Sequence, residues 1–294
     1  MRWDDERQSD NVEDDRGVSF GGGGGGGLML GGGGLGAVVL VGLALLFGVD
    51  PRVLLEAGAG GGGEQTTGVR TEPAGPRADD EDARFARTVL AYTEDTWGQI
   101  FTERGARYDP PTLVLYDEGH PTGCGFGQSA MGPFYCPNDH RVYLDLSFFR
   151  ELSSKFGAPG RFAEAYVIAH EVGHHVQNLL GVAERTQAQQ QRLGRAEGNQ
   201  ISVRVELQAD CFAGVWAMRT NQREKFLDPG DVEQGLTAAS AVGDDTLQRQ
   251  TQGRVVPDAF THGTSEQRMR WFQRGFAGGR LEMCDTFKGD YEGL

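Results

Sequence analysis

The sequence predicts an α+β domain that follows a long apolar segment. Strand-like stretches come first and helical stretches later, with no regular alternation, which is typical of an α+β domain rather than of a parallel α/β sheet. The chain has 294 residues, 38% of them hydrophobic, which is enough for one globular core with appendages. We predict four regions: an acidic, Gly-rich tail over 1–27, a transmembrane helix over 28–49, a flexible linker over 50–80 and one domain over 81–294.

The transmembrane prediction depends on the uncharged run LMLGGGGLGAVVLVGLALLFGV at 28–49. As a helix this run extends roughly 33 Å, which spans a bilayer, and its consecutive glycines weaken the first turns. A cleaved signal peptide is the alternative, but the run follows an acidic tail and lacks a convincing A-x-A site. The stretch at 50–80 is rich in Gly, Pro, Thr and charge, so we expect it to tether the domain to the membrane.

Cysteine usage bears on the compartment of the domain. None of the four cysteines lies in a CxxC pair, and an even number fits two disulfides, with buried free thiols as the alternative. We favour Cys124 with Cys136, which are close in sequence, and Cys211 with Cys284. Arginines are similarly frequent on both sides of the apolar run and do not decide its orientation. Because disulfides favour an oxidising compartment, we predict a single-pass cell-membrane protein with a cytoplasmic tail and an extracytoplasmic domain.

The net charge of −14 argues against nucleic acid as a partner, because binding phosphates needs a basic face. A net negative charge of this kind mainly affects the solubility of the protein. The 46 glycines are concentrated in runs at 21–27, 31–34 and 60–63, which are typical of spacers and cannot support a packed core.

The first half of the domain combines one helix with the strands. EDARFARTVLAYTEDTWGQIFTERG (81–105) places large apolar residues at three- and four-residue steps, which predicts an amphipathic helix. PTLVLY (111–116) is a short apolar run bounded by turn residues and predicts a strand. GPFYC-PNDH-RVYLD (132–145) predicts a hairpin whose turn is supplied by Pro, Asn and Asp.

The second half of the domain is predicted to be helical. Helical patterns cover 161–180, about 196–220, and 229–250. A last helix starts after His262, because Thr264 and Gln267 form a T-x-x-Q capping box ahead of an apolar stretch.

HEVGH at 170–174 is the strongest chemical signal. Residues four apart share a helix face, so His170 and His174 can converge on one ion while Glu171 reaches a neighbouring position. A buried structural histidine explains one of these two histidines, but it poorly explains the joint occurrence of His170, Glu171 and His174. The spacing therefore predicts a site for one Zn²⁺, which needs a third protein ligand if it is catalytic.

The third ligand is predicted on the next helix, within VRVELQADCFAGVWAM. Glu206 and Asp210 lie four residues apart in a stretch that is otherwise nearly free of charge. A solvated face is the ordinary explanation, but carboxylates on an apolar helix need a partner, and a cation supplies one. We predict that Glu206 binds the metal and that Asp210 accepts the other ring N–H of a ligand histidine, fixing its orientation.

The remaining histidines are weaker candidates. His175 points about 100° away from His174 on the same helix. His120 and His140 fall in loop or turn sequence and are expected to be exposed. His262 precedes a capped helix, where an imidazole could become a donor beside the metal if that helix packs against the site.

The sequence closely resembles the bacterial family of putative neutral zinc metallopeptidases, membrane-anchored proteins of the HExxH class with a glutamate as third ligand. The resemblance covers essentially the whole chain. It implies a zincin-like metallopeptidase domain with a small sheet and an active-site helix pair, with His170, His174 and Glu206 as ligands and Glu171 as the catalytic glutamate. One departure is Asp15, which stands where relatives have a basic residue. The segments that carry the resemblance are MRWDDERQSDNVEDDRG, TEDTWGQ, GCGFGQSAMGPFYCP, VYLDLSFF, YVIAHEVGHHVQ, ELQADCFAGVWA, QGRVVPDAFTHGTSEQR and RWFQRGF.

Together these features predict a membrane-anchored peptidase in which Glu171 is the general base for a zinc-activated water and the substrate is a peptide or protein. By analogy with the wider class, His262 is the first candidate for the oxyanion donor, and Tyr143 or Tyr166 the second. Two alternatives stay open: a zinc-stabilised, non-catalytic binding or scaffolding protein at the membrane, and hydrolysis of a non-peptide amide.

RVYLDLSFF also suggests a substrate-binding edge strand, with Tyr143, Leu144 and Asp145 as its contacts. The alternative for this stretch is an ordinary core strand.

Overall fold

The computed structural model describes residues 1–18 and 80–294. The predicted transmembrane helix at 28–49 and nearly all of the predicted linker lie outside these residues. Within the described part, none of the helices combines the length and apolar character needed to cross a membrane.

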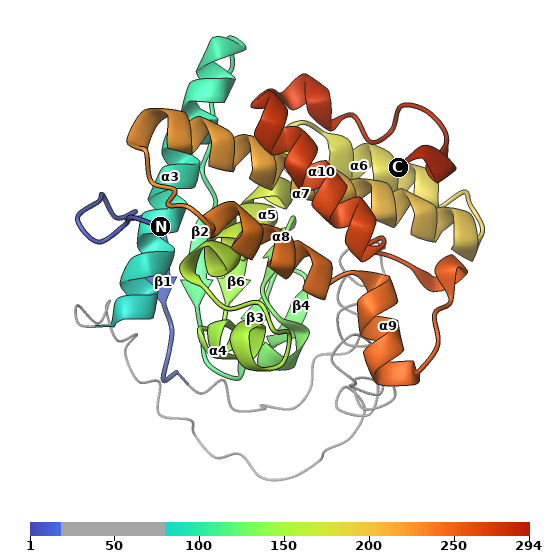
Figure 1. The fold of residues 1–294 in the computed structure, drawn as a ribbon, viewed down its shortest axis with the longest axis horizontal. Helices are drawn as coiled ribbons and strands as arrows, with labels where there is room; N and C mark the ends of the chain where they lie inside the picture. Colours follow the sequence, from blue (N-terminus) through green and yellow to red (C-terminus); the bar gives the residue numbers. More distant parts are fainter. Residues whose placement is uncertain (19–79) are drawn as a thin grey trace.

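The described residues contain a four-stranded sheet, a separate two-stranded hairpin and eight α-helices (Figure 1), which confirms a mixed α+β fold. The strands are β1 (Val12–Asp14), β2 (Thr112–Leu115), β3 (Gly119–Thr122), β4 (Gly125–Gln128), β5 (Phe134–Cys136) and β6 (Arg141–Leu144). The helices are α3 (Glu81–Glu103), α4 (Ser147–Ser154), α5 (Arg161–Leu179), α6 (Val182–Gln190), α7 (Arg195–Glu224), α8 (Asp231–Ala241), α9 (Asp244–Gln252) and α10 (Ser265–Gly278).

The sheet has the strand order β1-β2-β6-β5, with β1, β2 and β6 parallel and β5 antiparallel to β6. The predicted hairpin is therefore confirmed as β5–β6. The prediction that RVYLDLSFF supplies an edge strand is wrong, because β6 is paired on both sides and the chain turns into α4 at Ser147. Tyr143 and Leu144 are buried in the sheet, and Asp145 accepts the Ser147 N–H at 2.8 Å. These three residues are structural rather than open to an added strand.

The predicted helices are confirmed with one correction. The stretch 229–250 is not one helix but two, α8 and α9, separated at Val242 and Gly243. A Cβ on Gly243 would lie 2.4 Å from the backbone nitrogen of Ser265, so the chain approaches the start of α10 more closely than any side chain permits. The predicted capping box at Thr264 and Gln267 is present, and it fixes the N-terminus of α10.

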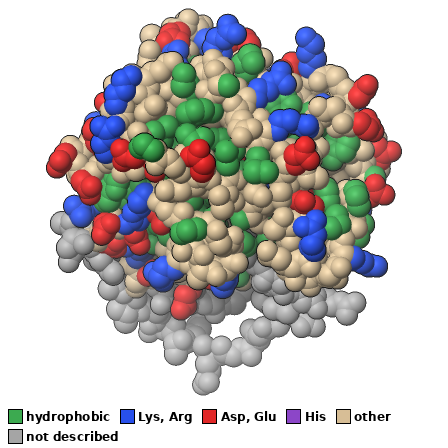
Figure 2. Space-filling model, in the orientation of Figure 1, with side chains coloured by type: hydrophobic (Ala, Val, Ile, Leu, Met, Phe, Trp, Pro, Cys, Tyr) green, Lys and Arg blue, Asp and Glu red, His purple; other side chains and the backbone are tan. Residues whose placement is uncertain are grey.

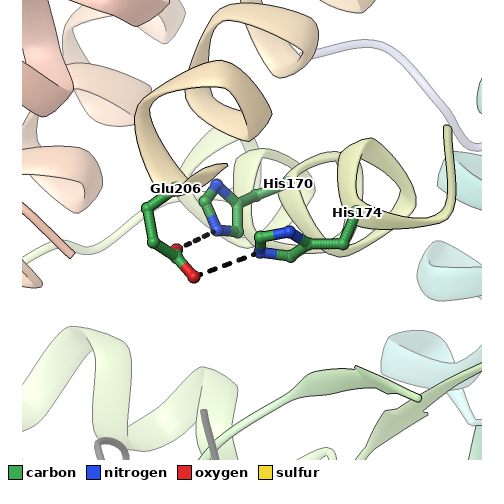
Figure 3. Close-up of side chains that lie close together, drawn as sticks. All are labelled: His170, His174 and Glu206. Atoms are coloured by element: carbon green, nitrogen blue, oxygen red, sulfur yellow. Dashed lines mark hydrogen bonds and ion pairs between the residues drawn. The ribbon is translucent and has the colours of Figure 1, made fainter. Parts of the chain in front are cut away.

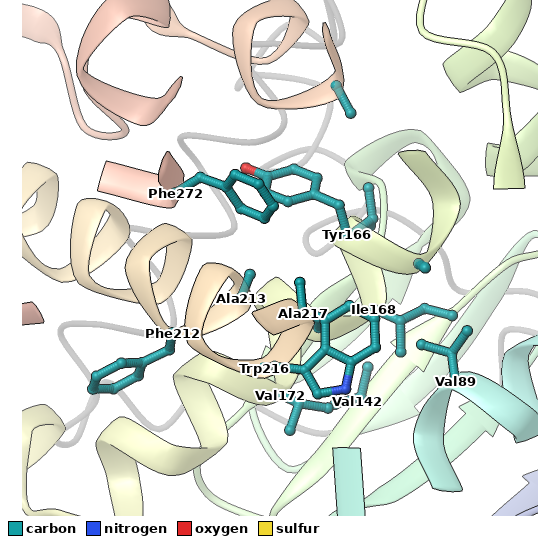
Figure 4. Close-up of a cluster of buried hydrophobic side chains, with 14 of the residues drawn as sticks. Val89, Val142, Tyr166, Ile168, Val172, Phe212, Ala213, Trp216, Ala217 and Phe272 are labelled. Atoms are coloured by element: carbon teal, nitrogen blue, oxygen red, sulfur yellow. The ribbon is translucent and has the colours of Figure 1, made fainter. Parts of the chain in front are cut away.

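Helix α7 packs against α5 and α10 at the centre of the main hydrophobic cluster, which Figure 4 shows around Trp216. Two glycines allow α7 and α10 to pack closely. A Cβ on Gly214 of α7 would lie 2.1 Å from the carbonyl oxygen of Phe272, and a Cβ on Gly275 of α10 would lie 1.9 Å from the carbonyl oxygen of Cys211. The ring of Phe162 on α5 stacks on Trp216 at 6.2 Å between centroids. Burying each such aromatic side chain contributes on the order of 2 kcal/mol. These contacts hold the three helices at fixed separations.

Two disulfides are present, and both are the predicted pairs. Cys124, in the turn between β3 and β4, bonds Cys136 at the end of β5, while Cys211 on α7 bonds Cys284 near the C-terminus. The first pair attaches the small hairpin to the sheet. The second attaches the C-terminal segment to the central helix.

Residues 1–18 lie along α3 and supply β1 at the edge of the sheet (Figure 1). Trp3, Ser9, Asp14 and Arg16 are buried in this position. On the face shown in Figure 2, basic and acidic side chains are interspersed between apolar ones.

Candidate metal centre

His170 and His174 project from the same face of α5 towards Glu206 on α7 (Figure 3). The Nε2 atom of His170 lies 3.1 Å from one Glu206 carboxylate oxygen, and the Nε2 atom of His174 lies 3.5 Å from the other. One ligand atom from each of the three residues falls within 4.8 Å of the others. The helix spacing therefore brings together the three residues that the sequence predicted.

The separations within this trio fit zinc. Zinc bonds of about 2.0–2.1 Å at tetrahedral angles place neighbouring ligand atoms about 3.4 Å apart. The two observed nitrogen–oxygen separations, 3.1 Å to one carboxylate oxygen and 3.5 Å to the other, lie near that value. Two imidazoles and one carboxylate are also the donor set typical of a zinc site that keeps one position for a reactant.

Gly173 lets the two helices come close enough for this geometry. A Cβ at this position would lie 3.1 Å from the backbone oxygen of Ala209 on α7, tighter than an ordinary contact. The glycine inside HEVGH is thus part of the site because it sets the distance between α5 and α7.

A buried network fixes the ring of His170. Its Nδ1 atom donates to Asp210 at 2.8 Å, and Arg268 on α10 donates to both Asp210 oxygens at 2.9 Å. The hydroxyl of Tyr166 also donates to Asp210. The Asp210 contact agrees with the predicted role, whereas sequence reasoning missed Arg268. The sequence did contain a hint of its role. Arg268 lies four and seven residues before Phe272 and Gly275 and so shares their face of α10, which indicates a buried charge.

Opposing charges shift the pKa values of this network. Burial raises the pKa of Asp210, but Arg268 and His170 outweigh it and lower the value to about 2. Burial lowers the pKa of His170, but Asp210 and Glu206 outweigh it and raise the value to about 9. Burial also works against the Glu206 carboxylate, yet His174 and His262 hold its pKa well below the ordinary range. The two carboxylates therefore stay ionised and favour a positive charge between them.

A separate contact orients His174. Its Nδ1 atom donates to the side-chain oxygen of Gln177 at 2.9 Å, and the Gln177 amide donates in turn to the Val205 carbonyl at 2.7 Å. With Nδ1 engaged there, Nε2 is the nitrogen that faces Glu206 and is the one placed to bind an ion. Sequence reasoning missed Gln177, although it lies one turn after His174.

His262 lines the same pocket as the trio, as the sequence analysis anticipated for a packed α10. Asp244, the first residue of α9, holds it in place. One Asp244 oxygen accepts the backbone N–H groups of Thr261, His262 and Gly263 at 2.7, 2.6 and 3.0 Å, and the other lies 3.3 Å from His262 Nδ1. Burial alone would lower the pKa of His262. The negative charges of Glu206 and Asp244 outweigh this effect, so the pKa is raised above its ordinary value.

Glu171 faces the same pocket and is 9% exposed. Burial raises its pKa, with the nearby histidines acting in the opposite direction. A carboxylate with a raised pKa accepts and returns a proton more readily near neutral pH than an ordinary one.

The other predicted donors and histidines lie elsewhere or are already engaged. Tyr143 hydrogen-bonds to Asp139 at 2.8 Å, and the Tyr166 hydroxyl is held by Asp210 and Arg268. His175 is buried against the Tyr135 hydroxyl and the Asp109 carbonyl, away from the trio. His140 is exposed as predicted.

The prediction that His120 is exposed is wrong. His120 is 5% exposed, and its Nε2 atom lies 2.8 Å from an Asp15 carboxylate oxygen. The departure noted at Asp15 therefore faces a buried histidine of the domain.

The pocket beside the trio has a largely apolar wall. Its residues come from β5 and the residue before it, the start of α4, the segment after α4, α5, the junction between α8 and α9, and α9 itself. They are Pro133, Phe134, Phe148, Phe156, Val167, Val242 and Leu247.

The ligand trio and the α+β fold agree with the protein family that the sequence matches. The family model described as "Putative neutral zinc metallopeptidase" matches residues 1–287, and the chain belongs to that family. It is 51% identical to a protein of Escherichia coli K12 named "Uncharacterized protein YpfJ", over 98% of this chain and 99% of that one. It is 41% identical to "Uncharacterized protein Rv2575" of Mycobacterium tuberculosis H37Rv, over 83% of this chain and 85% of the relative. No solved structure matches the chain.

Proposed function

We propose that this protein is a zinc-dependent metallopeptidase that hydrolyses peptide bonds. The observation that carries the proposal is the convergence of His170, His174 and Glu206 in a pocket that also contains Glu171. A purely structural zinc site has no use for a buried carboxylate beside the ligand set and is usually closed by four protein ligands. The presence of Glu171 therefore favours catalysis over scaffolding.

His170, His174 and Glu206 would hold the metal. When bound, zinc supplies a Lewis acid that polarises a carbonyl group and lowers the pKa of water towards about 7. Asp210 and Gln177 keep the two imidazoles in the tautomer that presents Nε2 to the ion. These residues fix the ligand geometry before the substrate arrives.

Glu171 is the proposed general base. It takes a proton from the water that attacks the peptide carbonyl and returns it to the departing amine, so the residue ends each cycle in its starting state. His262, which lines the same pocket and is held by Asp244, donates a hydrogen bond to the oxygen that becomes negative as the carbonyl is attacked. The upward direction of its pKa supports a ring that carries the proton this role needs.

The apolar wall supports a substrate class within peptides. Phe134, Phe148 and Val167 lie beside the catalytic residues and offer burial to a bulky apolar side chain next to the scissile bond. Burying such a side chain is worth on the order of 2 kcal/mol, which corresponds to about a thirtyfold preference in kcat/KM.

Membrane attachment remains part of the proposal. The uncharged run at 28–49 supports association with a bilayer. The two disulfides support an oxidising compartment for the domain.

The test uses the purified full chain with a mixed peptide library and mass spectrometry of the products. We expect cleavage that is lost with a chelator, restored by zinc and concentrated at Phe, Leu and similar residues. Glu171→Gln should abolish cleavage while leaving one zinc bound per chain, because the residue is not a ligand. Absence of cleavage by a zinc-loaded, folded chain would instead support the scaffold alternative.

A further inference from the structure

The first 18 residues form part of the domain, although residues 19–79 separate the two in sequence. β1 pairs with β2 in parallel register, Val12 opposite Leu113. The Leu113 N–H donates to the Asn11 carbonyl at 2.9 Å, and the Asp15 N–H donates to the Leu115 carbonyl at 2.8 Å. Backbone hydrogen bonds of this kind require direct contact between the two segments.

Apolar packing reinforces the strand pairing. Trp3 is 6% exposed and meets the ring of Phe85 on α3 edge to face at 5.2 Å between centroids. The guanidinium of Arg161 on α5 lies 5.6 Å from the Trp3 ring. Trp3 thus joins the main hydrophobic cluster of the domain rather than an independent one.

The arginines of this segment pair with carboxylates, two of them with partners on α3 or at its N-cap. Arg7 donates to Glu94 at 3.0 Å and to Asp95 at 2.7 Å. Arg16, which is 5% exposed, pairs with Asp14 and with Asp80, the N-cap of α3. A buried guanidinium is stable only where such partners are in place, so Arg16 is adapted to the docked position.

We infer that residues 1–18 and the domain from residue 80 onwards occupy the same compartment. A bilayer core is about 30 Å thick, and hydrogen bonds near 3 Å cannot form across it. A single crossing at 28–49, with the tail in the cytoplasm and the domain outside, is incompatible with this docked strand. Residues 1–18 and the domain must therefore lie on the same side of any bilayer. The inference is independent of the proposed peptidase activity.

Thiol labelling in intact cells tests the shared compartment. Asp10 and Arg192 are exposed, and all four natural cysteines are in disulfides, so Asp10→Cys and Arg192→Cys each provide one free thiol. The unsubstituted chain is the control for background labelling. With a membrane-impermeant maleimide, before and after permeabilisation, we expect the same result at both positions, either both labelled or both protected. Labelling of one thiol and protection of the other in intact cells would overturn the inference.

A cross-link tests the docking itself. Arg141 donates to Glu13 at 2.8 and 3.0 Å across the sheet, so Glu13→Cys with Arg141→Cys places two thiols within reach of a short bis-maleimide. A specific protease site inserted after Gly63 then separates the N-terminal fragment from the domain. We expect the two fragments to remain joined after cleavage in the double variant and to separate in either single variant. Separation in the cross-linker-treated double variant would show that the segment does not dock.

Discussion

Two histidines that line the same pocket, His170 and His262, are each paired with an aspartate, and the two pairs are built differently. Asp210 receives hydrogen bonds from three side chains, those of His170, Tyr166 and Arg268, all inside the helix core. Asp244 receives the backbone N–H groups of residues 261–263, and its contact with His262 is longer, at 3.3 Å against 2.8 Å for Asp210 and His170.

The two kinds of support suit two different roles for the histidines. The Asp210 pair combines a full positive charge with rigid helices, so it fixes both the position and the tautomer of a ring that must bind an ion. The Asp244 pair fixes residues 261–263 through their backbone N–H groups, so the His262 ring is positioned mainly by the chain that carries it. These are the two tasks that the proposed amide hydrolysis gives to its histidines, a constant metal ligand and a donor to the oxyanion.

Asp210→Asn gives the largest expected effect because it leaves the Arg268 guanidinium buried without a charged partner. We expect a loss of about 3–5 kcal/mol in the free energy of unfolding and a fall of about 10–100-fold in zinc affinity. Urea denaturation and zinc titration measure the two quantities. Adding Arg268→Met should recover much of the stability but not the zinc affinity. An unchanged free energy of unfolding in the single variant would contradict the account of this pair.

His262→Ala should affect the reaction rather than the fold or the metal. Loss of one donor to the developing oxyanion lowers kcat by about 10²–10³-fold, while zinc content and KM change little. Steady-state kinetics and elemental analysis of the same preparation measure this. Asp244→Ala, which frees the loop, is expected to reproduce part of the loss in kcat. Loss of zinc from His262→Ala would instead mean that His262 helps to hold the metal and is not only a donor to the oxyanion.

The sequence predicted the parts of this site that depend on local spacing. The convergence of His170 and His174 follows from a four-residue step on a helix, and the start of α10 follows from its capping box. Asp244 and Arg268 were missed because their roles arise between elements distant in sequence. An acidic first residue of a helix and an arginine on an amphipathic helix are ordinary features until their partners are known.

The sheet shows the same limit. The apolar run at 111–116 and the hairpin at 132–145 were predicted, but the position of β6 in the sheet was not. Strands of three or four residues carry little information about their neighbours, and β1 comes from a segment that was predicted to be a separate acidic tail. The break at Gly243 likewise depends on a contact with Ser265 that no local pattern contains.

The Asp210–His170 pair should also make stability depend on pH once zinc has been stripped with a chelator. The raised pKa of His170, about 9, means that its protonated form stabilises the fold below its unfolded pKa of about 6.5. This contribution, at most about 3 kcal/mol, is lost as the pH rises through 9. Thermal unfolding from pH 6 to 10 should show the decline in stripped protein, and Asp210→Asn should flatten it. An equal decline in zinc-loaded protein would rule out His170 as its source.

Gln177→Met gives the smallest expected effect, because a neutral amide orients His174 where a carboxylate orients His170. Methionine fills a similar volume but cannot accept the proton of His174 Nδ1, so the ring gains freedom to rotate or change tautomer. We expect zinc affinity to fall by roughly tenfold, at the low end of the range for such contacts. Competition with a chromogenic chelator measures this change, with Gln177→Glu as the variant that keeps an acceptor. A loss as large as that of Asp210→Asn would mean that charge is not what distinguishes the supports of the two ligand rings.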